Sequence, residues 1–217
     1  MDLAKLIELM EYEAKRRNAP IFLHNTKLEP WQILIATVLS ARTRDEQTAK
    51  AVERLFSRAR SIEELAEMSV EEIEELIRSV GFYRVKAKRI KEIAEILRRK
   101  RFPETMEELL SLPGVGRKTA NIVLAYMDKP AIAVDTHVHR IANRLGLVNT
   151  KRPEQTEEEL KKIFPEELWN KLNSAFVGFG QTVCLPRKPK CEECLVKSFC
   201  KNFARGKIFN FNAEITP

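Results

Sequence analysis

Helical patterns recur along almost the whole sequence, whereas alternating, strand-like patterns hardly occur. Apolar residues repeat at intervals of three or four positions, which places them on one face of a helix. The clearest runs are Trp31–Leu34–Ile35–Val38, Val70–Ile73–Leu76–Ile77 and Ile90–Ile93–Ala94–Leu97. Four segments read Ser/Thr-x-x-Glu ahead of an apolar run, a pattern typical of helix starts: Ser61–Glu64, Ser69–Glu72, Thr105–Glu108 and Thr156–Glu159. The sequence therefore predicts an all-α fold.

Three further segments outline the organisation of the chain. Glu29 to Arg42 is apolar nearly all round, with Pro30 in its first turn, so we expect a helix buried in a bundle. Met1 to Arg17 is amphipathic and predicts an N-terminal helix. Pro130 to Val134 is short and extended, which favours a linker over a strand and makes it a candidate domain boundary. The C-terminal end loses helical periodicity and is rich in Pro, Lys, Arg and Cys.

Composition narrows the class of partner. The 217 residues are 44% hydrophobic, which is enough to bury a substantial core. Lys and Arg outnumber Asp and Glu by 38 to 31, and the resulting charge of +7 favours a polyanion or an anionic surface as partner. No segment has the apolar stretch of a signal peptide or the roughly 18 apolar residues of a membrane span. We therefore expect a cytoplasmic or nucleoid-associated protein with no membrane partner.

Four cysteines gather near the C-terminus with the spacing C-x6-C-x2-C-x5-C: Cys184, Cys191, Cys194 and Cys200. Disulfides are rare in cytosolic proteins, so this clustering predicts a bound metal. Four thiolates suit either a tetrahedral zinc ion or a cubane cluster, although a zinc ribbon usually has two CxxC pairs where this chain has one. The first loop of this segment carries Arg187, Lys188 and Lys190, which are either phosphate contacts or a solvated basic cluster.

The segment Leu112-Pro-Gly-Val-Gly-Arg-Lys-Thr-Ala120 predicts a two-glycine turn between two helices. Gly114 and Gly116 allow main-chain amides to approach an anion, and the following helix adds the partial positive charge of its N-terminus. The turn is therefore either an ordinary connection or a phosphate-binding hairpin. Lys118, in the first turn of the second helix, is either a surface lysine that touches phosphate or an amine nucleophile of the Schiff-base type.

A second polar segment, Val134-Asp-Thr-His-Val-His-Arg140, opens another predicted helix with Asp135 at the N-cap. A carboxylate facing a lysine nucleophile can also stabilise an oxocarbenium-like sugar, so Asp135 can have both roles. His137 and His139 are two positions apart and face different sides of a helix, which argues against a shared metal ion.

The glycine hairpin, the Val134–Arg140 segment and the cysteine segment follow one another along the chain. In this order they resemble the endonuclease III family of DNA glycosylases in the helix-hairpin-helix superfamily. The resemblance runs from about Pro30 to Cys200. It implies two helical domains flanking a DNA-binding groove: a helical barrel domain over 22–133, and a discontinuous domain over 1–21 and 134–217 with a C-terminal cluster loop. It also implies a [4Fe–4S] cluster, Lys118 as nucleophile and Asp135 as catalytic carboxylate. Because related mismatch glycosylases commonly have another residue at the lysine position, Lys118 indicates a bifunctional glycosylase and lyase.

Two shorter segments are also similar to the family. Leu39-Ser-Ala-Arg-Thr-Arg-Asp45 matches a segment in which relatives have glutamine, the residue that fills the gap left by a flipped nucleotide, where this chain has Arg42. In Val80-Gly-Phe-Tyr83, Phe82 matches an apolar wedge. The alternatives are a charged helix end for Arg42 and a packing contact for Phe82.

Three functions remain open on this evidence. The first is a bifunctional glycosylase, acting as a monomer on double-stranded DNA with damaged bases or abasic sites, that removes oxidised or ring-saturated pyrimidines and nicks the strand by β-elimination. The second is a mismatch glycosylase for T or U opposite G. The third is a non-catalytic DNA-binding module with structural zinc.

Overall fold

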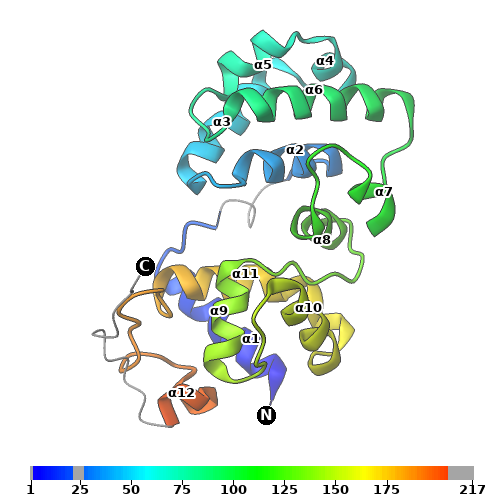
Figure 1. Cartoon of the computed structure of the whole chain (residues 1–217). Helices are drawn as coiled ribbons and strands as arrows, with labels where there is room; N and C mark the ends of the chain where they lie inside the picture. Colours follow the sequence, from blue (N-terminus) through cyan, green and yellow to red (C-terminus); the bar gives the residue numbers. More distant parts are fainter. Residues whose placement is uncertain (1, 22–26, 205–217) are drawn as a thin grey trace. The chain divides into compact units, whose positions relative to one another are not determined.

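The computed structural model describes residues 2–21 and 27–204, and within these ranges the chain is helical and has no strand (Figure 1). This observation confirms the predicted all-α fold. No helix among the described residues is long and apolar enough to cross a membrane. Met1 and Phe22, which bounded predicted segments, lie outside the described residues.

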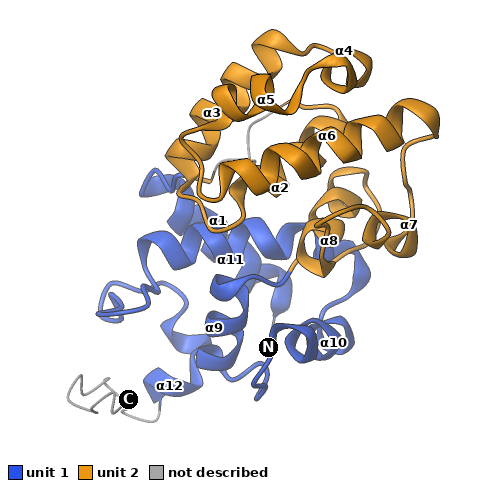
Figure 2. Ribbon diagram, turned by 45° about the horizontal axis from the view of Figure 1, so that its top comes forward, with its two compact units in different colours: residues 1–20, 134–217 blue, residues 21–133 orange. Residues whose placement is uncertain are grey.

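The chain divides into two compact units (Figure 2). Unit 1 comprises residues 1–20 and 134–217, and unit 2 comprises residues 21–133; the sequence analysis expected 1–21 with 134–217, and 22–133. Unit 1 is discontinuous because its first helix precedes all of unit 2 in the sequence. Pro130 to Val134, at the junction, is neither helix nor strand.

Unit 2 is built from the helices α2 (Pro30–Ser40), α3 (Asp45–Arg58), α4 (Ile62–Glu67), α5 (Val70–Ile77), α6 (Tyr83–Arg99), α7 (Met106–Leu110) and α8 (Arg117–Tyr126). Helix α2 packs against α3, α6 and α8. Every residue from Ile33 to Leu39 is buried, as expected for a helix that is apolar nearly all round. The helix is shorter than predicted, because it ends at Ser40 and leaves Arg42 in the following loop.

Among the helices of unit 2 that end without a basic residue in the last turn are α2, α4 and α5. The last carbonyl groups of a helix lack partners within it and carry partial negative charge. Cationic side chains from neighbouring helices supply the missing donors. Lys86 Nζ donates to Leu39 O (2.7 Å), Lys91 Nζ to Ala66 O (2.6 Å) and Arg54 Nε to Leu76 O (2.9 Å).

Unit 1 contains α1 (Leu3–Arg16), α9 (Thr136–Leu145), α10 (Pro153–Ile163), α11 (Trp169–Thr182) and α12 (Lys201–Ala204), with short 3-10 turns at Glu166–Leu168 and Lys197–Phe199. Helix α1 packs along α11, and α11 also contacts α9. Leu6, Met10, Phe176 and Phe179 are fully buried. Helices that precede and follow unit 2 in the sequence therefore share one core.

Three of the four predicted helix starts carry the expected serine or threonine cap. The Ser69 and Thr105 side chains accept from Glu72 N and Glu108 N, and both form complete capping boxes. Ser61 accepts from Glu64 N, but the Glu64 carboxylate binds the Arg60 amide instead of the Ser61 amide.

The fourth prediction, a helix start at Thr156, is wrong. Helix α10 begins at Pro153, and Thr156 is fully buried within it. Proline fits the first turn because its missing N–H would have no partner there. Gln155 Oε1 accepts from the Lys151 and Arg152 amides and so satisfies the chain entering the helix. Proline and glutamine, and not the Thr-x-x-Glu pattern, set this helix start.

Candidate functional site

The hairpin between α7 and α8 has the predicted two-glycine form. Helix α7 ends at Leu110 and α8 begins at Arg117, with Val115 buried between them. Gly114 has a φ of +75°, and a Cβ added there would lie 2.5 Å from the Cδ of Arg89. The positive φ favours glycine at this position, whereas the flexible Arg89 side chain could move away from a Cβ.

Gly116 differs from Gly114 in its surroundings. It is the N-cap of α8, and a Cβ added there would meet no atom within 4 Å. The open space lies at the end of a helix whose first turn has no acidic residue. Lys118 is the second residue of α8, and its side chain is exposed. Together the helix terminus and the exposed amine form a site suited to an anionic group.

Asp135 occupies the predicted N-cap of α9. Its Oδ1 accepts from His137 N (2.8 Å) and Val138 N (2.9 Å), which fixes the half-buried carboxylate at the helix start. The neighbouring histidines have other contacts: His139 Nδ1 lies 2.7 Å from Thr156 Oγ1, and His137 Nδ1 lies 3.2 Å from Arg140 Nη2. Asp135 belongs to unit 1 and Lys118 to unit 2.

Two loops of unit 2 bring Arg42 and Phe82 together. The guanidinium carbon of Arg42 lies 5.9 Å from the centre of the Phe82 ring, a cation–π contact. Phe82 is 63% exposed, so it is not the packing contact considered from the sequence. Arg42 is exposed and directly follows Ala41, the C-cap of α2, so it stands at the end of that helix with its side chain accessible. Both side chains are therefore available to a partner molecule.

Lys86 is a residue of this region that the sequence analysis missed. It is only 4% exposed and donates from beneath the two loops to Leu39, Ala41 and Thr43. The sequence does contain a signal, because Lys86 precedes Ile90 by four positions and so continues the buried stripe of α6. A lysine at an apolar stripe position indicates a buried cation with a specific set of acceptors.

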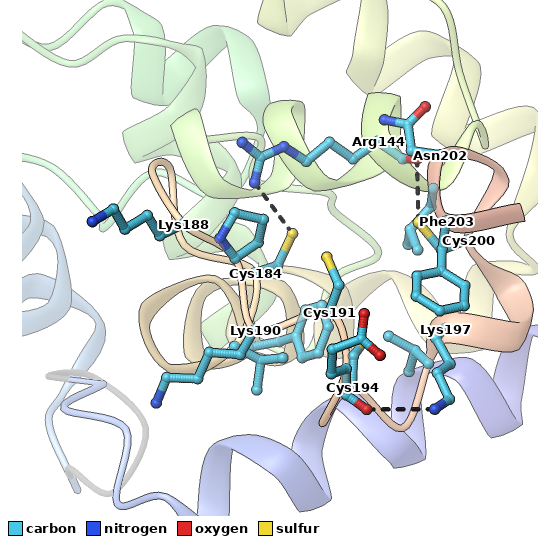
Figure 3. A pocket seen from close by; sticks show the side chains of 16 residues that line it. Arg144, Cys184, Lys188, Lys190, Cys191, Cys194, Lys197, Cys200, Asn202 and Phe203 are labelled. Carbon is cyan, nitrogen blue, oxygen red and sulfur yellow. Dashed lines mark hydrogen bonds between the residues drawn. The ribbon is translucent and has the colours of Figure 1, made fainter. Parts of the chain in front are cut away.

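The four cysteines line a single cavity of about 410 Å³ in unit 1 (Figure 3). Burial raises the pKa of the Cys194 thiol to about 12 and also raises the pKa of Cys191. Without a metal these thiols hold their protons at neutral pH, so a metal centre displaces protons as it binds. Lys188 and Lys190 line the same cavity, and Arg187 is exposed on the same loop.

Two arginines of α9 hold the start of the cysteine segment. Arg144 donates to Leu185 O (2.7 Å), to Pro186 O (2.8 Å) and to Cys184 Sγ (3.5 Å). Arg140, one turn earlier, donates to Cys184 O (3.0 Å). These cations favour a negatively charged thiolate centre. The position of Arg140 at the end of the Val134–Arg140 motif does not by itself indicate this role.

Helix α1 anchors the other side of the same segment. The buried Glu13 carboxylate accepts from Arg16, Arg17 and the Leu195 amide, and Arg17 also pairs with Glu193 at 2.9 Å. The cysteine segment around the cavity is thus held by α9 on one side and by α1 on the other.

The cysteine cavity can be compared with what each of the two predicted metal centres needs. Among residues 2–21 and 27–204, no three His, Cys, Asp or Glu side chains are close enough to hold a single metal ion. A zinc ion gathers its sulfur ligands at about 2.3 Å from one point, whereas a four-iron cluster keeps its four sulfur ligands farther apart around a larger body. Four cysteines spaced around one cavity fit the cluster.

Comparison with known proteins places the chain in a family. Residues 35–166 match the family model of HhH-GPD superfamily base excision DNA repair proteins, and residues 184–200 match that of the iron–sulfur binding domain of endonuclease III. The chain is 53% identical over 194 residues to Endonuclease III of Thermotoga maritima, covering 86% of this chain and 91% of the relative. It is 42% identical to the Endonuclease III homolog of Encephalitozoon cuniculi, covering 78% of each.

Solved structures give the same result. A trapped Endonuclease III–DNA covalent intermediate matches with a TM-score of 0.80 and 34% identity, covering 95% of this chain and 99% of that one. A thermostable thymine-DNA glycosylase matches with a TM-score of 0.79 and 25% identity, covering 93% and 96%.

The fold, the hairpin and the cysteine segment define a helix-hairpin-helix protein of base excision DNA repair. Within that superfamily, the chain belongs to the endonuclease III family. It is a DNA-binding glycosylase and lyase, and it carries a [4Fe–4S] cluster. This membership favours an enzyme over the non-catalytic zinc module considered from the sequence.

Proposed function

We propose that this enzyme removes oxidised or ring-saturated pyrimidines from double-stranded DNA, with Lys118 as the nucleophile. The observation that carries the proposal is the exposed Lys118 amine in the first turn of α8, directly after the open Gly116 terminus. A phosphate bound at that terminus would bring the sugar of a neighbouring nucleotide close to the amine. Lysine at this position supports strand cleavage as well as base removal.

In the proposed reaction, the neutral amine of Lys118 is the nucleophile. The amine nitrogen forms a bond to C1′ of the sugar as the bond from C1′ to the base breaks, and the base leaves with the bonding electrons. Opening of the sugar ring gives an imine between the lysine and C1′. The imine accepts electrons when a C2′ proton is lost, and the 3′ phosphate departs. This β-elimination nicks the strand and needs no external oxidant or reductant.

Asp135 supports this reaction through its negative charge. The sugar becomes oxocarbenium-like as the base departs, and a fixed carboxylate lowers the energy of that positive charge. The two main-chain amides that bind Oδ1 hold the carboxylate in one orientation.

The four cysteines are the residues that we assign to the cluster: Cys184, Cys191, Cys194 and Cys200. When bound, the cluster supplies four metal–thiolate bonds that cross-link this segment. The chain's own contribution is to fix the loops between these ligands, through Arg144 on one side and Glu13 on the other. The exposed Arg187 and Lys190 are then available to DNA phosphates.

The remaining DNA contacts follow from exposure and charge. We assign phosphate binding to Gly114 and Gly116, whose hairpin offers main-chain amides without reading sequence. We assign extrusion of the damaged nucleotide to Phe82 and Arg42, because an exposed aromatic ring beside a cation can enter a base stack and occupy the vacated space.

One catalytic unit per chain makes the monomer the proposed active form, and a DNA substrate makes the nucleoid its proposed location.

A mismatch glycosylase for T or U opposite G is the second candidate. Arg42 in place of the family glutamine and the similarity to a thermostable thymine-DNA glycosylase favour it. Lys118 argues against it, because such enzymes commonly have another residue at that position.

A panel of duplexes separates the two candidates. Each duplex carries one dihydrothymine opposite adenine, one uracil opposite guanine, one thymine opposite guanine, or no lesion, and single-turnover base release is measured at equal enzyme excess. We expect rapid release of dihydrothymine with strand cleavage and little release from the others. Faster release of uracil or thymine opposite guanine would support the mismatch function instead.

A further inference from the structure

Lys86 combines deep burial with a complete set of hydrogen bonds. It is the fourth residue of α6, and its side chain is almost inaccessible to solvent. The ammonium group donates to Leu39 O (2.7 Å), Ala41 O (2.7 Å) and Thr43 Oγ1 (2.9 Å). Three protons therefore meet three acceptors, which fixes the position of the group.

Burial of an ammonium group at this position costs free energy, because the charge loses its water. All three acceptors are neutral, and burial lowers the pKa of Lys86 to about 8. An apolar side chain of similar length would fill the same space without the cost of desolvating a charge. What the ammonium adds is the fixed geometry of the chain from Leu39 to Thr43, where α2 ends with no basic residue of its own.

The hydrogen bonds continue from this loop into a second one. Thr43 Oγ1, which accepts from Lys86, also accepts from the Gly81 amide at 3.1 Å. A Cβ added at Gly81 would lie 3.0 Å from Arg42 O, so the two loops approach as closely as glycine permits. Lys86, Thr43 and Gly81 thus connect the segment after α2 with the segment before α6.

Each of these loops presents one exposed residue in an unusual backbone conformation. Arg42 has a φ of +53° and Phe82 a φ of +57°, both in the left-handed region that non-glycine residues rarely adopt. Such conformations persist where surrounding bonds enforce them, and they gather at functional sites. The Lys86 bonds lie directly below this pair.

We propose that Lys86 is a positioning residue for base extrusion, holding the loops at Leu39–Thr43 and Val80–Phe82 together so that Arg42 and Phe82 meet DNA as one preformed pair. This inference rests on the extrusion role proposed above. Lys86 is enclosed beneath the loops and touches no substrate, so its effect is transmitted through Phe82 and Arg42.

A double-variant cycle tests the inference. The cluster-loaded Lys86→Met, Phe82→Ala and doubly substituted enzymes are compared in single-turnover release of dihydrothymine from a paired duplex, and in nicking of a preformed abasic site. Nicking needs no base extrusion, so it reports the remaining chemistry and the integrity of the fold. We expect Lys86→Met to slow base release roughly tenfold more than nicking, and to add little once Phe82 is alanine, because coupled residues are not additive.

Two matched controls separate positioning from general stability. Lys91→Met removes another α6 lysine that donates to a helix-terminal carbonyl, Ala66 O, away from these loops. It should lower thermal stability without changing the ratio of base release to nicking. Thr43→Val removes the shared hydroxyl and should reproduce the selective loss, whereas Thr43→Ser retains the hydroxyl and should restore base release.

Amide hydrogen exchange provides a readout that does not depend on DNA. Lys86→Met should accelerate exchange at the Gly81 and Thr43 amides, and Lys91→Met should not. Unchanged exchange at Gly81 would overturn the positioning role. So would equal loss of base release and nicking in Lys86→Met, or an additive effect in the double variant.

The two proposals can fail separately. If Phe82→Ala slows both reactions equally, the extrusion role itself fails, and with it the link from Lys86 to extrusion, whatever the exchange data show. If Phe82→Ala is selective but Lys86→Met is not, only the positioning role fails.

Discussion

At the scale of single residues, Asp135 has a structural role and a proposed chemical one that can be measured apart. Its Oδ1 caps α9 by accepting two main-chain amides. An uncharged asparagine can form the same cap, because its side-chain oxygen occupies the same place. The cap depends on shape, whereas the stabilisation of a developing positive charge depends on the carboxylate.

We therefore expect Asp135→Asn to slow base release by orders of magnitude while changing the free energy of unfolding by only about 1 kcal/mol or less. Asp135→Ala should slow release as strongly and also lose about 1 kcal/mol of stability with the cap. Single-turnover kinetics and denaturant unfolding of both variants provide the two readouts. Near-normal base release by Asp135→Asn would restrict this residue to capping.

Lys86 predicts a dependence of stability on pH. Its pKa is about 8 in the folded protein, against 10.5 for an ordinary lysine, because burial disfavours the charged form. Between these values the unfolded chain holds more protons than the folded one, so the contribution of Lys86 to the unfolding free energy rises with pH. The wild type should therefore gain stability relative to Lys86→Met between pH 8 and 10 in paired denaturant titrations. A difference that stays constant or falls across this range would contradict the lowered pKa.

At the scale of helices and loops, the sequence predicted what local chemistry determines. Ser69 and Thr105 mark helix starts because a hydroxyl and a following glutamate satisfy free amides without help from distant residues. Thr156 has the same pattern but lies inside α10, where Pro153 had already set the start. The Lys86 bonds were not predicted, because they join residues more than 40 positions apart.

The cysteine segment gives a prediction at this scale. If its four thiolates hold the cluster, purified protein should be yellow-brown with broad visible absorption, since thiolate-to-iron charge transfer absorbs there. Cys194→Ser should lose most of the iron and this absorption, and should destabilise unit 1. Colourless wild-type protein with one zinc per chain after anaerobic purification would contradict the assignment.

At the scale of the whole molecule, the chain distributes its proposed chemistry over two units. Lys118 belongs to unit 2 and Asp135 to unit 1, although only the rest of α8 and the short segment after it separate them in the sequence. The assignment of both residues to catalysis is a prediction from the family motifs. Local patterns do not show that α1 shares a core with α11, because that contact joins segments far apart in the sequence, and only the family resemblance implied a domain containing both.

The net charge of +7 predicts the character of DNA binding. If hairpin amides and basic loop residues bind phosphates as proposed, affinity for an undamaged duplex should fall steeply with salt, with a log–log slope of roughly −0.9 per phosphate neutralised. Lys190→Gln should reduce the slope by about one such contact. Fluorescence anisotropy over a series of salt concentrations measures both slopes. A salt-independent affinity would rule out phosphate binding by Gly114, Gly116 and Lys190.

The most direct test of the account is covalent trapping at Lys118. Borohydride added during turnover reduces an imine and locks enzyme to DNA, so the wild type should give a stable complex with a dihydrothymine duplex. Lys118→Gln should give neither complex nor nick while keeping its affinity for an abasic duplex. Lys129→Gln, which changes a lysine bound to Glu104 just beyond α8, should behave as the wild type. A trapped complex formed by Lys118→Gln would show that another amine is the nucleophile and would contradict the central assignment.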